Sequence, residues 1–140
     1  MALFRKKRVE RPKSLLGNAL YQYDNIMKRN LNKIVGRMLA QKSVNPKKAD
    51  IVFKNVCSEF DAITRDISKE NLKVDYRSDK IRYMIMDMMS KVRALFDKAR
   101  EHDFDHLKIK KDKVVSKWNE IVDEREIIKG KMKDIESDYL

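Results

Sequence analysis

The chain has 140 residues, of which 42% are hydrophobic, and this is enough for one domain with one core. Only three Gly, two Pro and one Cys are present, which disfavours strands joined by tight turns, a disulfide framework and a zinc finger. The net charge is +11, and the first 45 residues hold +9 of it. This excess predicts attraction to polyanions such as nucleic acid, anionic lipid or an acidic protein.

Residues 1–13 form a basic arm that contains Pro12 and shows no helical periodicity. We expect the arm to be flexible, or to become ordered only on binding. Its polybasic run suits phosphate neutralisation on nucleic acid, nuclear import or contact with an anionic membrane, where Leu3 and Phe4 would insert beside the charges. The bases of the arm are Arg5, Lys6, Lys7, Arg8, Arg11 and Lys13.

A first helix is predicted over residues 14–42, with Ser14 as its N-cap. Its apolar residues recur in steps of three or four and form one face, which comprises Leu16, Leu20, Tyr23, Met27, Leu31, Ile34 and Met38. On a flank of this helix, Arg29, Lys33 and Arg37 follow a spacing of four and form a basic stripe. The stripe continues the positive charge of the arm, which favours an extended polyanion as the partner.

The pair Asn45-Pro46 signals the start of a second helix, predicted over residues 46–68. After an expected loop over 69–78, a third helix is predicted over 79–100. Both carry heptad seams, formed by Ala49, Phe53, Val56, Phe60, Ile63 and Ile67 in the second and by Ile81, Ile85, Met88, Val92, Leu95 and Ala99 in the third. Tyr83 and Met86 lie off the third seam, and we predict that they contact a protein partner.

A fourth helix is predicted over residues 104–139, where a heptad resumes at Leu107 after the seam slips across residues 102–106. No Gly or Pro separates the third and fourth helices, so one long bent helix is an alternative to a hairpin. Lys111 and Arg125 fall on the fourth seam, which predicts a weak core element that projects as a coiled coil. Trp118, between them, is either a core residue or the anchor of a protein interface, and its charged neighbours on the seam favour the interface.

The predicted fold is all-α: one helical domain over 14–140 with about four helices, arranged as a bundle or as an extended hairpin. We find no glycine-rich loop and no nucleophile paired with a base, so no enzymatic role, cofactor or metal is predicted. His102 and His106 supply only two potential metal ligands, and a polar hinge at the helix junction fits them better.

The lone Cys57 and the lack of a signal peptide or apolar span predict a cytoplasmic or nuclear protein that is neither secreted nor transmembrane. The leading functional prediction is non-enzymatic binding of DNA or RNA through about five or six backbone phosphates, with low sequence specificity because no base-reading motif is present. The alternative is a structural or adaptor subunit whose heptad seams bind a protein partner or a second copy of the chain. Peripheral membrane contact is a third option.

Overall fold

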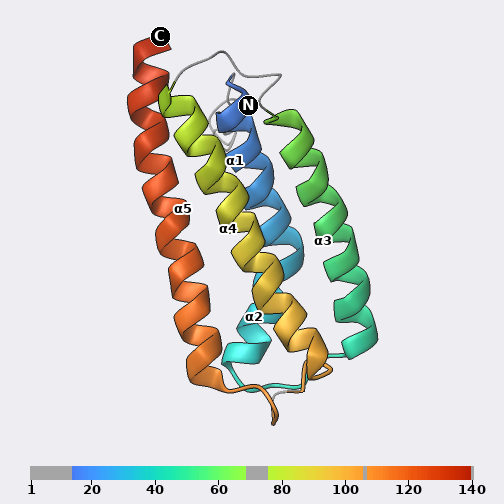
Figure 1. The fold of residues 1–140 in the computed structure, drawn as a ribbon. Helices are drawn as coiled ribbons and strands as arrows, with labels where there is room; N and C mark the ends of the chain where they lie inside the picture. The colour runs from blue at the N-terminus through green and yellow to red at the C-terminus, as the bar shows by residue number, and fades with distance from the viewer. Residues whose placement is uncertain (1–13, 69–75, 106, 140) are drawn as a thin grey trace, which may run out of the picture.

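The computed structural model describes residues 14–68, 76–105 and 107–139, and within these ranges the only regular secondary structure is helical, with no strand. α1 (Leu15–Ile26), η2 (Met27–Leu31) and α2 (Asn32–Leu39) follow one another without a break and make one long rod. α3 (Pro46–Asp66), α4 (Tyr76–Glu101) and α5 (Lys111–Tyr139) run alternately up and down beside it (Figure 1). The predicted all-α helical bundle is therefore confirmed.

Two predicted N-caps explain where α1 and α3 begin. The Ser14 hydroxyl accepts a hydrogen bond from the Gly17 amide at 3.0 Å. The Asn45 side-chain oxygen accepts from the amides of Lys47 and Lys48 at 3.1 and 3.2 Å, and Pro46 opens α3 where no amide hydrogen is needed. Both helix starts thus follow from the local sequence.

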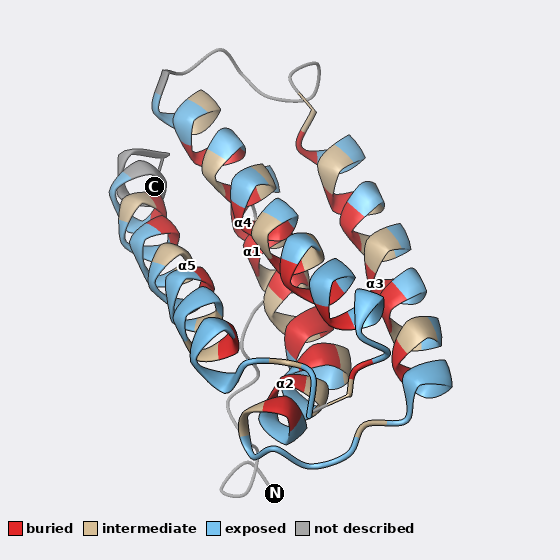
Figure 2. Ribbon diagram, turned by 60° about the horizontal axis from the view of Figure 1, so that its bottom comes forward, coloured by how far each residue is buried: buried red, intermediate tan, exposed pale blue. Residues whose placement is uncertain are grey.

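The seams predicted for the second and third helices are confirmed, since all of their residues are buried (Figure 2). Aromatic rings connect the helices through these seams. The ring of Tyr23 stacks on that of Phe60 with centroids 5.9 Å apart, and the rings of Phe53 and Phe96 are 5.7 Å apart. One hydrophobic core therefore joins the rod of α1, η2 and α2 to α3 and α4.

The first helix contains a π-helical segment, η2, which the sequence pattern did not predict. Its backbone amides bond to carbonyls five residues earlier, as between Asn32 and Met27, so each turn takes about one residue more than in an α-helix. The buried face consequently moves on by one position after Leu31. Val35 is buried, whereas Ile34, predicted on the apolar face, is only partly buried.

Helix boundaries differ from the prediction at three places. The first rod ends at Leu39 rather than residue 42, and Gln41 beyond it adopts a left-handed φ of 55°. α4 begins at Tyr76, so the last part of the expected 69–78 loop is helical, while residues 69–75 lie outside the described residues. α5 begins at Lys111, seven residues later than expected.

The connection between α4 and α5 is a hairpin, so the continuous bent helix is wrong. Asp103 and Phe104 have φ of 53° and 55°, a left-handed conformation that ends α4 without a glycine. Burial of the Phe104 ring, 6.4 Å from Phe96, offsets the cost of that backbone. Leu107, predicted to resume the seam, is 83% exposed because it lies in the connection rather than in a helix.

α5 packs along α4 and also contacts α1 and α2, so it does not project as the predicted coiled coil. Its seam residues Val114, Ile121 and Ile128 are buried in the common core. Arg125 interrupts that seam but reaches α1, where its Nε and Nη2 donate to the two carboxylate oxygens of Asp24 at 3.0 and 2.5 Å. Arg125, the charged residue on the α5 seam, therefore forms a bidentate ion pair with Asp24.

The Asp24–Arg125 ion pair joins α1 to α5. We expect a coupling free energy of about 0.5–1 kcal/mol between these two residues. The measurement is a double-mutant cycle of Asp24→Ala and Arg125→Ala by urea unfolding. The neighbouring Arg125–Glu126 contact is the control, since Glu126 is 62% exposed and its coupling should be close to zero. Equal coupling in both cycles would contradict a specific role for Asp24.

Candidate nucleic-acid interface

The most uneven stretch of charge in the described chain is residues 25–49, which we call the acid-free segment. It contains seven bases and no Asp or Glu. The segment begins in the last turn of α1, spans η2 and α2, crosses the connection 40–45 and ends in the first turn of α3. Its bases are Lys28, Arg29, Lys33, Arg37, Lys42, Lys47 and Lys48.

The predicted basic stripe lies on the outer surface of this segment. Arg29, Lys33 and Arg37 are all exposed, while Leu31 and Val35 on the same rod are buried in the core. Figure 2 shows the same division along α2, with one side buried and the rest exposed. The stripe is therefore available to a partner in solution.

Two of the stripe guanidinium groups are held against backbone carbonyls. Arg29 Nε donates to the Asn25 carbonyl at 3.2 Å, beside the π-helical turn, and Arg37 Nε donates to the Ser43 carbonyl at 2.8 Å, across the connection that follows α2. Both bonds use the Nε hydrogen. The terminal Nη groups of the two arginines make no hydrogen bond within the described residues, so they remain donors for an anion.

Several bases in other parts of the bundle are neutralised by ion pairs. Lys54 and Arg100 both contact Asp50, Arg93 contacts Asp61, and Arg125 contacts Asp24. In contrast, none of the seven bases of the acid-free segment forms an ion pair with any described residue. No direct ion pair with a described residue therefore compensates the positive charge of this segment.

The end of α2, the start of α3 and the start of α5 lie at the same end of the bundle, which is the lower end in Figure 1. α2 also contacts α5 directly. This arrangement adds further exposed lysines to the same end, although Asp103, Asp105 and Asp112 lie among them. The added lysines are Lys108, Lys110, Lys111 and Lys113.

The arm predicted to act together with the stripe, residues 1–13, lies outside the described residues. The structure does show where the arm is attached. α1 starts at Leu15, at the end of the bundle opposite Arg37, and the rod from Leu15 to Leu39 is about 37 Å long at 1.5 Å per residue. The arm is therefore attached at one end of this rod, and the stripe lies on the other half of it.

The three residues predicted to contact a protein partner do not share one surface. Tyr83 and Met86 lie in the first half of α4, where Arg82 contacts both: its guanidinium carbon is 4.3 Å from the Tyr83 ring centroid, and its Nη1 donates to the Met86 sulfur at 3.5 Å. Tyr83 is 56% exposed, and Met86 is partly buried. Trp118 is partly buried near the start of α5, towards the opposite end of the bundle.

Groups with catalytic or metal-binding chemistry are sparse. Burial raises the pKa of the partly buried Cys57 thiol, which disfavours the nucleophilic thiolate near neutral pH. His102 follows the last helical residue of α4, and His106 lies outside the described residues. Among the described residues, no three side chains of His, Cys, Asp or Glu are grouped to bind a metal ion, and no helix is long and apolar enough to cross a membrane.

Lys42, Lys47 and Lys48 join the candidate interface only through the fold, and the periodicity of the single helices does not predict them. The signal that would have found them is the absence of any carboxylate between Asp24 and Asp50, which crosses the boundary between two predicted helices. Comparison with known proteins adds no assignment: no family model matches the chain, and neither a curated protein nor a solved structure is significantly similar to it.

Proposed function

We propose that this chain is a non-enzymatic protein that binds DNA or RNA through its phosphate backbone, using the basic arm together with the stripe of Arg29, Lys33 and Arg37. Lys47 and Lys48 at the start of α3 extend the contact surface. The observation that carries the proposal is the acid-free segment, whose seven bases have no ion-pair partner among the described residues. Displacement of counterions by such a surface supplies the binding free energy.

The first turn of α3 supports the same proposal. It carries Lys47 and Lys48 and no acidic residue, although the amino-terminal end of a helix has a positive electrostatic potential. Asn45 already accepts from the amides of both lysines, so the backbone is satisfied but the side-chain charges are not. A phosphate beside the two ammonium groups would remove this unfavourable charge arrangement.

Binding is expected to depend little on nucleotide sequence. Tyr23, near the stripe in sequence, is 3% exposed and stacked on Phe60, so its ring is not available to a base. Contacts from Lys and Arg to phosphate position a duplex or single strand without reading its bases. DNA and RNA are therefore both expected to bind.

The adaptor alternative requires an exposed apolar strip. Large apolar side chains that are exposed in the described chain are instead scattered over four helices and one connection, and they are Leu15, Ile51, Tyr83, Leu107, Val122 and Ile127. Single exposed apolar residues of this kind are ordinary on a soluble surface. This scatter favours the nucleic-acid proposal over the adaptor one.

Fluorescence anisotropy of short labelled DNA and RNA, titrated with the full chain and with a chain that starts at Ser14, tests the proposal. We expect both chains to bind both nucleic acids, and the shorter chain to bind more weakly because it lacks a net charge of +5. Absence of binding by the full chain at low salt would refute the proposal. Loss of all binding on truncation would assign it to the arm alone.

A further inference from the structure

A groove of about 880 Å³ runs between the second half of α4 and the first half of α5, outside the acid-free segment. None of the seven bases of the acid-free segment lines it. Small or buried apolar side chains from both helices and their connection form its floor. They are Ala94, Leu95, Ala99, Ile109, Val114 and Ile121.

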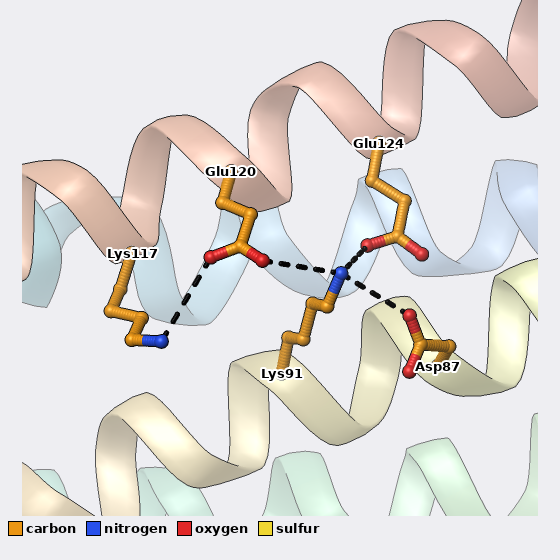
Figure 3. A network of polar contacts seen from close by, with 5 residues as sticks. All are labelled: Asp87, Lys91, Lys117, Glu120 and Glu124. Carbon is orange, nitrogen blue, oxygen red and sulfur yellow. Dashed lines mark hydrogen bonds and ion pairs between the residues drawn. The ribbon is translucent and has the colours of Figure 1, made fainter.

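An ion-pair network is centred on Lys91 (Figure 3), and it lies at one end of the groove because Lys91 and Glu120 belong to the lining. The Lys91 ammonium on α4 is 2.7 Å from Glu124 and 3.4 Å from Glu120, both on α5, and 3.2 Å from Asp87 on its own helix. The hydrogen bond to Glu124 raises the pKa of Lys91, so the ammonium stays charged. These contacts tie the two helices together above the groove.

The other end is closed by the connection between α4 and α5, which contributes Lys108, Ile109 and Lys110 to the lining. Ten residues separate Lys91 from Glu101 at the end of α4, which corresponds to about 15 Å of helix. The groove is therefore a bounded site, and its volume falls in the usual range for small-molecule sites, about 300–1,000 Å³. A partner helix would need a groove that continues beyond these ends.

Lysines surround the apolar floor. Lys117 is 3.9 Å from Glu120, and Lys91 is fully occupied by its three carboxylates. The remaining lysines of the lining form no ion pair within the part of the chain that the structure describes. They are Lys98, Lys108, Lys110 and Lys113, all exposed.

From this combination we propose that the α4–α5 groove binds a small anionic amphiphile, an acyl chain that ends in a carboxylate. The chain lies on the apolar floor, and the carboxylate meets the unpaired lysines around it. Charge complementarity excludes the basic arm as the occupant, because the arm and the groove lining are both positive. The site lies outside the acid-free segment, although Lys108, Lys110 and Lys113 belong both to its lining and to the basic end of the bundle. It adds a second ligand class to the proposed function.

Isothermal titration calorimetry of the full chain with sodium octanoate and sodium decanoate, below micelle-forming concentrations, tests this proposal. We expect saturable binding of one decanoate, tighter than octanoate by about an order of magnitude, because each buried methylene improves affinity about fourfold. Octanol, a neutral ligand with one alkyl carbon more than octanoate, should bind at least about threefold more weakly than octanoate. One charged contact is worth roughly tenfold or more in affinity, and the extra methylene offsets about fourfold of it.

Ala94→Phe is the variant that fills the groove, since Ala94 is exposed on its floor and a larger side chain can enter without displacing the core. It should abolish saturable decanoate binding, whereas Ser90→Phe, one turn away on α4 and outside the lining, should leave it unchanged. The paired variant Lys98→Gln/Lys113→Gln should weaken decanoate but not octanol. Lys129→Gln/Lys133→Gln, with the same charge change on the far half of α5, should weaken neither.

No saturable binding by the wild-type chain, or equal binding by Ala94→Phe and Ser90→Phe, would overturn the proposal. Binding of an acidic helical peptide without binding of decanoate would also overturn it, in favour of a protein partner. Far-ultraviolet circular dichroism checks that Ala94→Phe is folded, and the lysine pair gives an independent test if it is not. Ala94→Phe should keep its affinity for nucleic acid, so failure of this site and failure of the proposed function are distinguishable.

Discussion

Replacing Lys33, Lys47 and Lys48 together with glutamine is expected to weaken the affinity for DNA by two to three orders of magnitude at about 0.1 M salt. Each phosphate contact releases about 0.9 counterion, which corresponds to roughly an eightfold gain in affinity at this salt concentration relative to 1 M. The three lysines are exposed, and their side chains make no hydrogen bond or ion pair with any described residue, so the bundle should be unaffected. Fluorescence anisotropy with a labelled duplex measures the change.

The matched control replaces Lys80, Lys129 and Lys133 with glutamine. These lysines are also exposed, and they lie in the first half of α4 and the last half of α5, at the end of the bundle opposite Lys47. The net charge falls by the same amount in both triple variants. We expect the control to lose less than about tenfold in affinity, and equal losses would show that net charge, rather than the acid-free segment, governs binding.

Phe60→Ala is expected to lower the free energy of unfolding by about 3–5 kcal/mol, a large part of the 5–15 kcal/mol typical of a domain. The Phe60 ring is fully buried, stacks on Tyr23 at 5.9 Å and lies 5.9 Å from the guanidinium carbon of Arg93. Its removal leaves a cavity between α1 and α3 and takes away the surface on which both groups rest. Urea unfolding followed by circular dichroism measures the loss.

Ile51→Ala is the control on the same helix, since Ile51 is 61% exposed. It should change the free energy of unfolding by less than about 0.5 kcal/mol. A similar effect of Ile51→Ala and Phe60→Ala would mean that α3 does not pack through the face that the structure gives it.

Periodicity predicted the second and third helices well because their seams alternate regularly and their ends carry strong signals, such as Asn45 and Pro46 at the start of α3. It misplaced Ile34 in the first rod, because the π-helical segment shifts the register by about one residue and leaves no mark in the apolar pattern. The position of a π-helical turn depends on packing across the whole bundle, which local periodicity does not contain.

For a related reason, the sequence does not decide between the α4–α5 hairpin and one bent helix. A left-handed helix end is normally recognised by Gly or Asn, and here Asp103 and Phe104 adopt it because burial of the Phe104 ring compensates. From sequence alone, Arg125 on the seam predicts that α5 is a weak core element. Its partner Asp24 lies 101 residues earlier, and no local pattern connects the two residues. Long-range ion pairs of this kind become visible only in the folded structure.

For the candidate site, the stripe of Arg29, Lys33 and Arg37 followed from helical spacing alone, and the structure places all three on the exposed surface. Helical spacing does not predict that lysines of the connection 40–45 and of α3 lie near this stripe. They belong to different elements, which the fold brings to one end of the bundle. The α4–α5 groove had no sequence signal at all. Its floor is made of residues that resemble an ordinary seam, and they come from two helices and the connection between them.

If phosphate contacts of the basic surface hold the nucleic acid, the affinity must depend steeply on salt concentration. For the full chain, the logarithm of the association constant should fall linearly with the logarithm of salt concentration, with a slope of about −5 for six contacts. The triple variant of Lys33, Lys47 and Lys48 should give a slope shallower by about three. A slope near zero for the full chain, or the same slope for both proteins, would show that phosphate contacts of this surface do not hold the nucleic acid.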